Sequence, residues 1–243
     1  GPPGGLVGWR GGRPWASPPA CGPRAGAPPP PGGPTPVLRE ELGAIGRGAE
    51  WMMSRACGGP AAGAHRGALW VTGLLVAAAA PPRELPAAAK RIAAHPDRRA
   101  PRRPSPGSQV SATYGAAGAC GEARAGFPHV LRALDALSRA RSTGATEAQA
   151  RLDTLLTVMS TLQDTGPLYH AGPPVLRRVQ DGARGVLEAG GTATAAGTAA
   201  LARLDAELGE LGVAPRGSAA VLAGALFLDG LPAPLAHPSN RAV

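Results

Sequence analysis

The chain has 243 residues, a formal net charge of +9 and an isoelectric point near 11.0, and 44% of its residues are hydrophobic although only 3% are aromatic. Its apolar residues are mostly Ala, Leu and Val, which suits closely packed helices and argues against a β-sandwich or β-barrel, where β-branched and aromatic residues are enriched. The longest apolar run, residues 67–80, has 14 residues, whereas a membrane span needs about 20, so no membrane-spanning helix and no membrane partner are predicted.

The positive charge has two interpretations. The first is a GC-rich genome, whose codons favour Arg over Lys; Lys90 is the single lysine. The second is a polyanionic partner such as nucleic acid or a nucleotide polyphosphate. No periodic basic stripe with interleaved aromatic residues occurs, so nucleic acid is the less favoured partner. A nucleic-acid interface would use Arg98, Arg99, Arg102 and Arg103.

The three cysteines are Cys21, Cys57 and Cys120, an odd number without a CxxC pair. This pattern predicts neither a disulfide framework nor a zinc site. A reduced, cytoplasmic setting is therefore expected.

The chain begins with a segment rich in glycine and proline. Residues 1–36 contain 22 Gly or Pro, and no acidic residue appears before Glu40. Such a segment buries too little apolar surface to offset the entropy lost on ordering, so it is expected to be irregular or disordered. One helical domain is expected over residues 37–231, followed by a tail over 232–243.

Three helices are predicted in the first half of the domain, over residues 37–56, 64–80 and 84–94. The second of them is apolar nearly all round and is expected to be central. A basic, proline-broken linker is expected over residues 95–109. The apolar face predicted for the first helix consists of Leu38, Leu42, Ile45, Ala49, Met52 and Met53.

Apolar periodicity in the second half predicts helices over residues 122–140, 146–162, 175–189, 192–211 and 217–228. Thr146 and Gln149 form the capping-box pattern that opens the second of these. No stretch alternates as a strand does. The fold class is therefore all-α, a single domain of about seven or eight helices.

Two polar positions stand out at predicted helix entries. His65 and Arg66 precede the central helix, whose first backbone N–H groups suit a phosphate; the alternative is that the pair only solvates the helix end. Glu122 is a candidate general base or metal ligand, or else an acid that the dipole favours at a helix N-terminus.

A third polar cluster lies in the stretch 160–172, "STLQDTGPLYHAG", which is expected to end a helix at Gly166-Pro167. Asp164 at a helix C-terminus would oppose the helix dipole, which favours a cation or metal ion beside it. Thr165, Tyr169 and His170 either satisfy the helix end or face a ligand. No Walker A motif, Rossmann glycine pattern, HExxH or Gly-x-Ser-x-Gly occurs.

The order of four separated motifs resembles that of the triphosphoribosyl-dephospho-CoA synthase family, and the branch that serves malonate decarboxylase looks nearest, with the citrate lyase branch as its sister. The resemblance covers residues 38–231. The motifs are "GAHRGALWVTGLLVAAA" (63–79), "YGAAGACGEARAGFPHV" (114–130), "LDTLLTVMSTLQDTGPLYHAG" (152–172) and "GTATAAGTAALARLDAELGELGVAPRGSAAVLAGALFLDGL" (191–231).

The resemblance implies an all-α transferase. Its members join the triphosphoribosyl unit of ATP to a ribose hydroxyl of 3′-dephospho-CoA and release adenine, and the product goes to an acyl-carrier-protein transferase as a prosthetic-group precursor. An N-glycosidic bond breaks through an oxocarbenium-like centre, which calls for cations on the triphosphate, Mg²⁺ held by carboxylates, and a base near the attacking hydroxyl.

The residues that match the family motifs are the expected site residues. Asp164 is the first choice and Glu122 the second, both as catalytic groups and as Mg²⁺ ligands. The expected substrate-binding residues are His65, Arg66, Gly67, Thr165, Tyr169, His170, Gly217 and Ser218.

Several positions depart from the family pattern. Gly63 and Ala64 replace Asn and Thr, Gln163 replaces the first acid of an Asp-Asp pair, and Ala220 replaces an Asp. His170-Ala171 also stands where the family has Arg-Gly. The lost groups are polar while the apolar framework persists, which predicts weakened activity. The rival hypothesis is a non-catalytic helical relative that binds a nucleotide or a partner.

Overall fold

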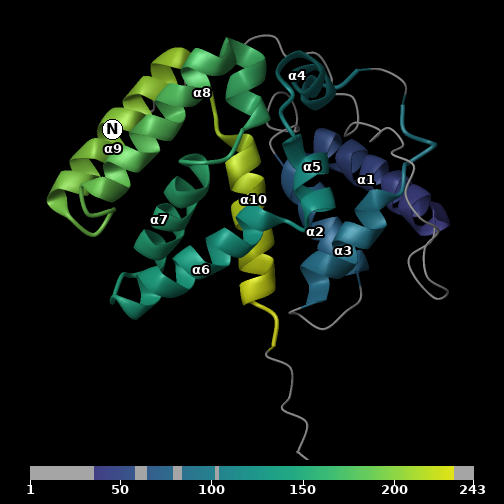
Figure 1. Ribbon diagram of the computed structural model, residues 1–243, viewed down its shortest axis with the longest axis horizontal. Helices are drawn as coiled ribbons and strands as arrows, with labels where there is room; N and C mark the ends of the chain where they lie inside the picture. The colour runs from purple at the N-terminus through teal and green to yellow at the C-terminus, as the bar shows by residue number, and fades with distance from the viewer. Residues whose placement is uncertain (1–35, 58–64, 79–83, 102–103, 233–243) are drawn as a thin grey trace, which may run out of the picture.

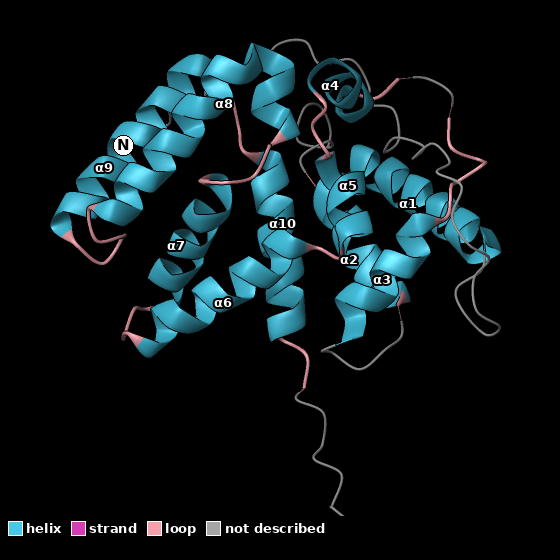
Figure 2. Cartoon of the chain, in the orientation of Figure 1, coloured by secondary structure: helices cyan, strands magenta, loops and turns pink. Residues whose placement is uncertain are grey.

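The computed structural model of the chain describes residues 36–57, 65–78, 84–101 and 104–232 (Figure 1). These residues form ten α-helices and no strand, as Figure 2 shows, which confirms the all-α class; short helices that the sequence did not indicate account for the larger number. The helices are α1 (Pro36–Cys57), α2 (Arg66–Ala77), α3 (Leu85–Ala94), α4 (Pro106–Tyr114), α5 (Gly118–Ala125), α6 (Pro128–Ser142), α7 (Glu147–Met159), α8 (Thr165–Glu188), α9 (Ala195–Leu211) and α10 (Arg216–Asp229). None of these helices is long and apolar enough to cross a bilayer.

Helix α10 lies at the centre of the fold and packs on α2, α6 and α7 (Figure 1). Helices α1–α5 lie on one side of it in this view and α6–α9 on the other. The main core joins α2, α3, α5, α6, α7 and α10, and it includes Val71, Leu75, Ile92, Phe127, Val130, Val158 and Val221. Close approach of α10 to α2 requires a small residue, because a Cβ at Gly224 would lie 2.6 Å from Cγ1 of Val71.

A second core fills the space between α7, α8 and α9, where Leu156, Val179, Val186 and Leu204 are buried. A smaller cluster, with Val110 and Leu168 among its members, holds α4 against α8. The first part of α8 therefore packs on α4, and its later turns pack on α7 and α9. Gly172, with φ 77° and ψ −175°, breaks the helix between these two parts.

The face predicted as apolar on α1 is only partly correct. Leu38 and Leu42 pack against the main core, but Ile45 and Met52 are exposed. The buried residue of this helix is Arg39. Arg39 forms an ion pair with Asp97, which is also buried, and the Arg39 Nη1–Asp97 Oδ2 distance is 3.7 Å.

The basic linker expected over residues 95–109 is wrong in part. Asp97 accepts a 2.8 Å hydrogen bond from Nη1 of Arg47, and it therefore anchors α1 to this segment. Ser105 then caps α4 in a reciprocal capping box with Ser108, so a helix begins inside the expected linker. The sequence signal was a serine before Pro106, since proline is well tolerated in a first helical turn.

The single helix expected over residues 122–140 is wrong. The chain forms α5 and α6, and Gly126 and Phe127 between them both adopt left-handed backbone conformations, with φ of 87° and 58°. Left-handed phenylalanine is rare, so the break is not readable from apolar spacing.

The helix expected to end at Gly166-Pro167 is also wrong, because a helix begins there. Helix α7 ends at Met159, and Asp164 is the N-cap of α8, whose second part contains the helix expected over 175–189. Proline is compatible with the first turn because the N–H groups there have no partner within the helix. The Thr146–Gln149 capping box is confirmed.

The expected glycine- and proline-rich segment lies outside the described residues except for Pro36, and so does the tail beyond residue 232. Of the three cysteines, Cys57 is free and exposed, and Cys21 lies outside the described residues.

Candidate functional site

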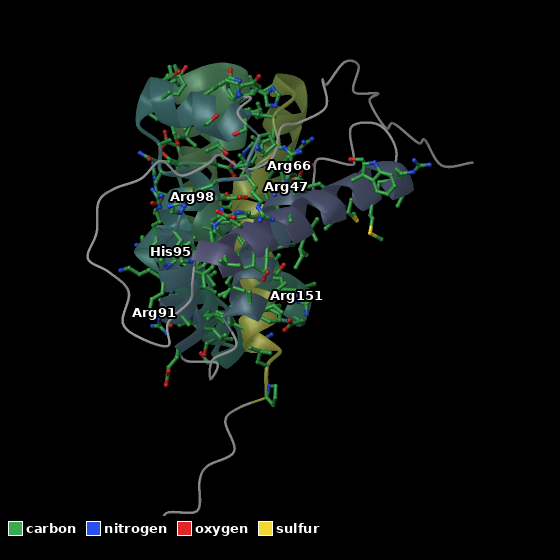
Figure 3. All side chains as sticks on the ribbon, turned by 90° about the vertical axis from the view of Figure 1, so that its right-hand side faces the viewer. Arg47, Arg66, Arg91, His95, Arg98 and Arg151 are labelled. Atoms are coloured by element: carbon green, nitrogen blue, oxygen red, sulfur yellow. The ribbon has the colours of Figure 1, made fainter. Side chains whose placement is uncertain are left out.

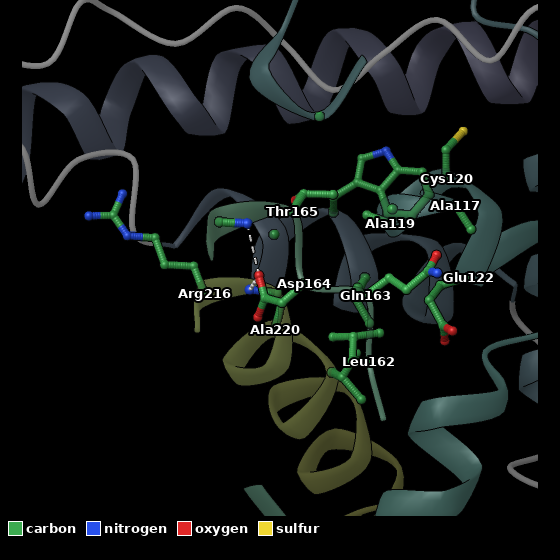
Figure 4. A pocket seen from close by; sticks show the side chains of 18 of the residues that line it. Ala117, Ala119, Cys120, Glu122, Leu162, Gln163, Asp164, Thr165, Arg216 and Ala220 are labelled. Carbon is green, nitrogen blue, oxygen red and sulfur yellow. Dashed lines mark hydrogen bonds between the residues drawn. The ribbon is translucent and has the colours of Figure 1, made fainter. Parts of the chain in front are cut away.

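A cavity of about 150 Å³ opens between α2, α4, α5, α8 and α10. Most of its wall is apolar or small, and the charged residues that line it are Arg66, Glu122, Asp164 and Arg216. Figure 4 shows Arg216 and Glu122 toward opposite sides of the pocket, with Asp164 and Gln163 between them.

Five of the described helices begin at this pocket. The wall includes the first residues or N-caps of α2 (Arg66), α4 (Ser105), α5 (Ala117), α8 (Asp164) and α10 (Arg216). Each helix N-terminus carries a partial positive charge and backbone N–H groups without a partner in the helix. Their convergence makes the pocket suited to an anion.

Arg66 lines the pocket from the first position of α2 and also contacts α1 (Figure 3). Its Nε lies 2.6 Å from Oε1 of Glu50, and its Nη2 donates a 3.0 Å hydrogen bond to Oε2. Burial raises the pKa of the Glu50 carboxyl and lowers that of Arg66, while the attraction between the two opposes both shifts. The charge of Arg66 is thus partly balanced from outside the pocket.

Asp164 is almost fully buried, with 2% of its surface exposed, and its carboxylate accepts four hydrogen bonds. Oδ1 accepts the N–H groups of Gly166 at 3.0 Å and Gly217 at 3.2 Å, and Oδ2 accepts the N–H and hydroxyl of Ser218 at 2.8 and 3.0 Å. Burial raises the pKa of the Asp164 carboxyl, and these hydrogen bonds oppose the rise. Asp164 therefore caps α8 and α10 together, and its expected position against a helix dipole is corrected.

The carboxylate of Asp164 does not fit a direct Mg²⁺ site. A carboxylate has about four lone-pair positions, and at Asp164 all four are used by protein donors. Within the described residues, no group of three or more His, Cys, Asp or Glu side chains is arranged to hold a metal ion.

Glu122 lies in the pocket wall and inside α5, not at the start of a long helix. Its Oε1 lies 2.5 Å from Nδ1 of His129, and its Oε2 accepts the backbone N–H of His129 at 3.2 Å. His129 is in the first turn of α6. The carboxylate of Glu122 thus lies at a helix N-terminus, but this is the N-terminus of α6 and not that of its own helix.

The expected site residues separate into two groups. Arg66, Gly67, Glu122, Asp164, Thr165 and Gly217 line the pocket. The other four do not line it: His65 is exposed at the N-cap of α2, Ser218 is buried behind Asp164, and Tyr169 and His170 lie on an exposed part of α8. Burial and the charge of Arg216 lower the pKa of His170.

Arg216 is the pocket residue that the sequence analysis missed. It opens α10 directly before Gly217, inside the matched stretch "APRGSAA", and this proximity was the available signal. Gln163 and Ala220, at which the sequence analysis expects departures from the family pattern, line the same pocket.

The residues of the alternative nucleic-acid interface do not form one described surface. Arg102 and Arg103 lie outside the described residues. Arg99 Nε lies 3.2 Å from Oε2 of Glu40, which balances its charge, and Arg98 lies beside it in the chain (Figure 3).

Comparison with known proteins places the whole described region in one group. The family model for ATP:dephospho-CoA triphosphoribosyl transferase matches residues 27–239. A probable 2-(5''-triphosphoribosyl)-3'-dephosphocoenzyme-A synthase of Pseudomonas fluorescens is 49% identical over 199 residues, covering 79% of this chain and 68% of that protein. The corresponding probable synthase of Azotobacter vinelandii is 46% identical over 209 residues, covering 83% and 71%.

A 2-(5''-triphosphoribosyl)-3'-dephosphocoenzyme-A synthase of Klebsiella pneumoniae is 45% identical over 200 residues, covering 79% of this chain and 71% of that protein. No solved structure matches the chain significantly.

Proposed function

Because the chain belongs to the ATP:dephospho-CoA triphosphoribosyl transferase family, and is thus a transferase, we propose that it moves the triphosphoribosyl group of ATP to 3′-dephospho-CoA and releases adenine. The relatives are named for the product of this transfer. The pocket lined by Arg66, Glu122 and Arg216 is the proposed site.

The observation that carries this proposal is the convergence of five helix N-termini on one pocket. A triphosphate concentrates negative charge, which the dipoles of helix N-termini favour. The backbone N–H groups of Gly166, Gly217 and Ser218 already donate to Asp164, so they are not assigned to the phosphate. Arg66 and Arg216 add guanidinium donors at the same wall, which suit phosphate oxygens because the donors are planar and always charged. Gly67 and Gly217 have no room for a side chain, since a Cβ there would lie 2.9 Å from Ala220 and from Asp164, and Thr165 lines the pocket beside them.

The proposed reaction exchanges one bond at the anomeric carbon of the ATP ribose. The bond from this carbon to N9 of adenine breaks, its electron pair leaves with the base, and a ribose hydroxyl oxygen of 3′-dephospho-CoA forms the new bond. The hydroxyl proton passes to a base, for which Glu122 is the candidate, and the departing adenine takes up a proton. General-base help of this kind contributes about 10²–10⁴-fold.

Asp164 serves a different role in this proposal. Four protein donors already occupy its carboxylate, so it organises the N-termini of α8 and α10 instead of acting on substrate. Mg²⁺ enters with ATP as part of the substrate, held by phosphate oxygens and water, as is usual for this ion. No step is assigned to it.

The cellular setting that we propose follows from the resemblance. The product is the prosthetic-group precursor for the acyl carrier protein of malonate decarboxylase, handed on by an acyl-carrier-protein transferase in the cytoplasm. The helical domain over residues 37–231 is the proposed catalytic unit. His65, Tyr169, His170 and Ser218 keep proposed supporting roles around the pocket, with Ser218 acting through Asp164.

The test is adenine release from ATP and 3′-dephospho-CoA in the presence of Mg²⁺, followed by chromatography. Adenine that forms only when both substrates are present supports the proposal, and its amount should equal that of the triphosphoribosyl product. Absence of adenine from a folded, helical sample that binds ATP would overturn it in favour of a non-catalytic nucleotide-binding relative. Gln163 and Ala220, which line the pocket where the family has acids, are the observation that favours this second candidate.

A further inference from the structure

We propose that His129 is a positioning residue that holds the carboxylate of Glu122 in the orientation of a general base. This inference rests on the proposed transferase function and adds a residue to its site. The geometry that supports it is a two-point contact: Nδ1 of His129 lies 2.5 Å from Oε1 of Glu122, and the His129 backbone N–H donates to Oε2 at 3.2 Å.

The two pocket carboxylates differ in the acceptor capacity left to them. At Asp164 four donors occupy both oxygens, and 2% of the residue is exposed. At Glu122 the His129 ring and backbone use two of about four lone-pair positions. Glu122 therefore keeps positions that can accept a proton from a substrate hydroxyl, and Asp164 does not.

The backbone between the two residues fixes their relative placement. Gly126 and Phe127 are both left-handed, and the N–H of Phe127 donates to the carbonyl of Glu122 at 2.8 Å. Left-handed backbone in a bulky residue costs on the order of 1–3 kcal/mol and persists where the surroundings impose it. Here the fully buried Phe127 ring imposes it, and the resulting turn brings the first turn of α6 onto Glu122.

In this proposal Nδ1 of His129 carries a proton, so that the ring and the backbone N–H both donate to the carboxylate of Glu122. When the hydroxyl of 3′-dephospho-CoA attacks, its proton moves to Glu122, the new C–O bond forms, and the C–N bond electrons leave with adenine. The His129 donor keeps the carboxylate from rotating away from the pocket during this step.

The experiment compares three single variants with the wild-type protein by adenine release. His129→Leu removes the side-chain donor and keeps bulk, whereas His129→Asn keeps an N–H near the position of Nδ1. We expect Glu122→Gln to lower kcat about 10²–10⁴-fold. We expect His129→Leu to lower kcat about 10–100-fold with KM for ATP changed less than about threefold, and His129→Asn to recover most of the loss.

The double variant separates positioning from an independent contribution. If His129 acts only through Glu122, adding His129→Leu to Glu122→Gln lowers kcat no further, since the two residues act as a unit. Losses that multiply would overturn the proposal, and so would wild-type rates in His129→Leu or equal losses in His129→Leu and His129→Asn. Circular dichroism shows whether His129→Leu folds. If it does not, the turnover of His129→Asn and the Nδ1–H proton resonance of His129 test the contact with Glu122 instead. We expect this resonance to move upfield in Glu122→Gln.

The proposed function fails in a distinguishable way. If the wild-type protein forms no adenine, the transferase proposal and this inference fall together. If it forms adenine and the His129 variants match it, the inference alone falls.

Discussion

Asp164 and Ser218, separated by 54 residues in the chain, are joined by two hydrogen bonds, from the backbone N–H and the hydroxyl of Ser218 to Oδ2 of Asp164. The contact ties the start of α8 to the start of α10. It places a buried carboxylate among donors that have no other described partner nearby, so the pair supports the wall of the pocket.

Replacing Asp164 by Ala should therefore lower stability as well as activity. Buried N–H groups left without acceptors cost about 1–3 kcal/mol each, and Asp164 accepts from three of them, so we expect at least about 3 kcal/mol less free energy of unfolding in urea. Ser218→Ala, which removes one of the four donors, should cost about 1 kcal/mol. An Asp164→Ala protein with wild-type stability and no turnover would instead return Asp164 to the chemistry.

The arginines of the pocket should govern ATP affinity. We expect Arg66→Gln and Arg216→Gln each to raise the Kd for ATP about tenfold or more, measured by calorimetry, because charge-assisted hydrogen bonds are worth about 1.5–3 kcal/mol. Arg178→Gln is the matched control, since it removes an equal charge from an exposed position on α8 that pairs with Glu207 at 3.8 Å. Glu50→Gln should leave ATP binding intact or tighter, because Arg66 keeps its charge; weaker binding in this variant would contradict the assignment.

Restoring the acid at Gln163 should raise turnover. This residue lines the pocket and its side chain is exposed, so an aspartate fits there without a burial penalty. We expect Gln163→Asp to increase kcat for adenine release about tenfold or more, since charge placed for substrate-bound Mg²⁺ is worth several kcal/mol. Gln163→Asn is the neutral control. Equal rates in the two variants would show that the charge at this position does not affect turnover.

The close packing of α10 on α2 predicts that an added methyl group has opposite effects on stability at two helical glycines, Gly224 and Gly209. A Cβ at Gly224 would meet Val71 at 2.6 Å, whereas a Cβ at Gly209 on α9 meets nothing within 4 Å. We expect Gly224→Ala to destabilise by about 1–3 kcal/mol through overpacking. Gly209→Ala should stabilise by about 0.5–1 kcal/mol because alanine loses less backbone entropy in a helix. Thermal unfolding of both variants tests the helix interface.

An ion-pair network at the far end of α10 should make stability depend on acid pH. Arg141 of α6 donates to Glu147, the first residue of α7, at 2.9 Å and to Asp229, the last residue of α10, at 2.8 Å. Hydrogen bonds from Arg141 and then Arg151 lower the pKa of Glu147 from 4.5 to about 2. Its ionised form is favoured in the folded state, so its contribution is present above about pH 4.5 and is lost as pH falls toward 2.

Melting temperatures measured from pH 5 to pH 2 should thus fall more steeply for the wild-type protein than for Glu147→Gln. Arg141→Gln should flatten the curve to a similar degree. Added salt should reduce the difference, since this network is exposed and screened. Parallel curves for wild-type and Glu147→Gln proteins would show that the pair contributes nothing.

The sequence predicts those structural features that depend on residues close together in the chain. The Thr146–Gln149 capping box follows from local spacing and is present, and the apolar segment expected to form a buried helix does so as α2, where Val71, Leu74 and Leu75 are buried. The exposed Ile45 and Met52 had the same spacing, but the partner that determines the orientation of α1 is Asp97, about fifty residues away. Apolar periodicity has no access to a buried ion pair.

For the candidate site, the sequence predicts which residues belong to it better than it predicts how they contact one another. Asp164 was identified as important, but its role depends on Gly217 and Ser218, which no local pattern connects to it. The break at Phe127 was missed because left-handed phenylalanine has no sequence signature, and with it the contact of His129 with Glu122 was missed. Tertiary contacts supply the missing information in both cases.

The convergence of helix N-termini also bears on how the empty protein folds. Like-signed dipole ends repel one another, so assembling α2, α4, α5, α8 and α10 around a vacant pocket opposes folding, and Asp164 offsets only part of that repulsion. An anion that binds the folded state alone raises its stability by mass action. An anion that binds in the pocket should therefore stabilise the fold, so the unfolding temperature of the protein should rise with ATP concentration.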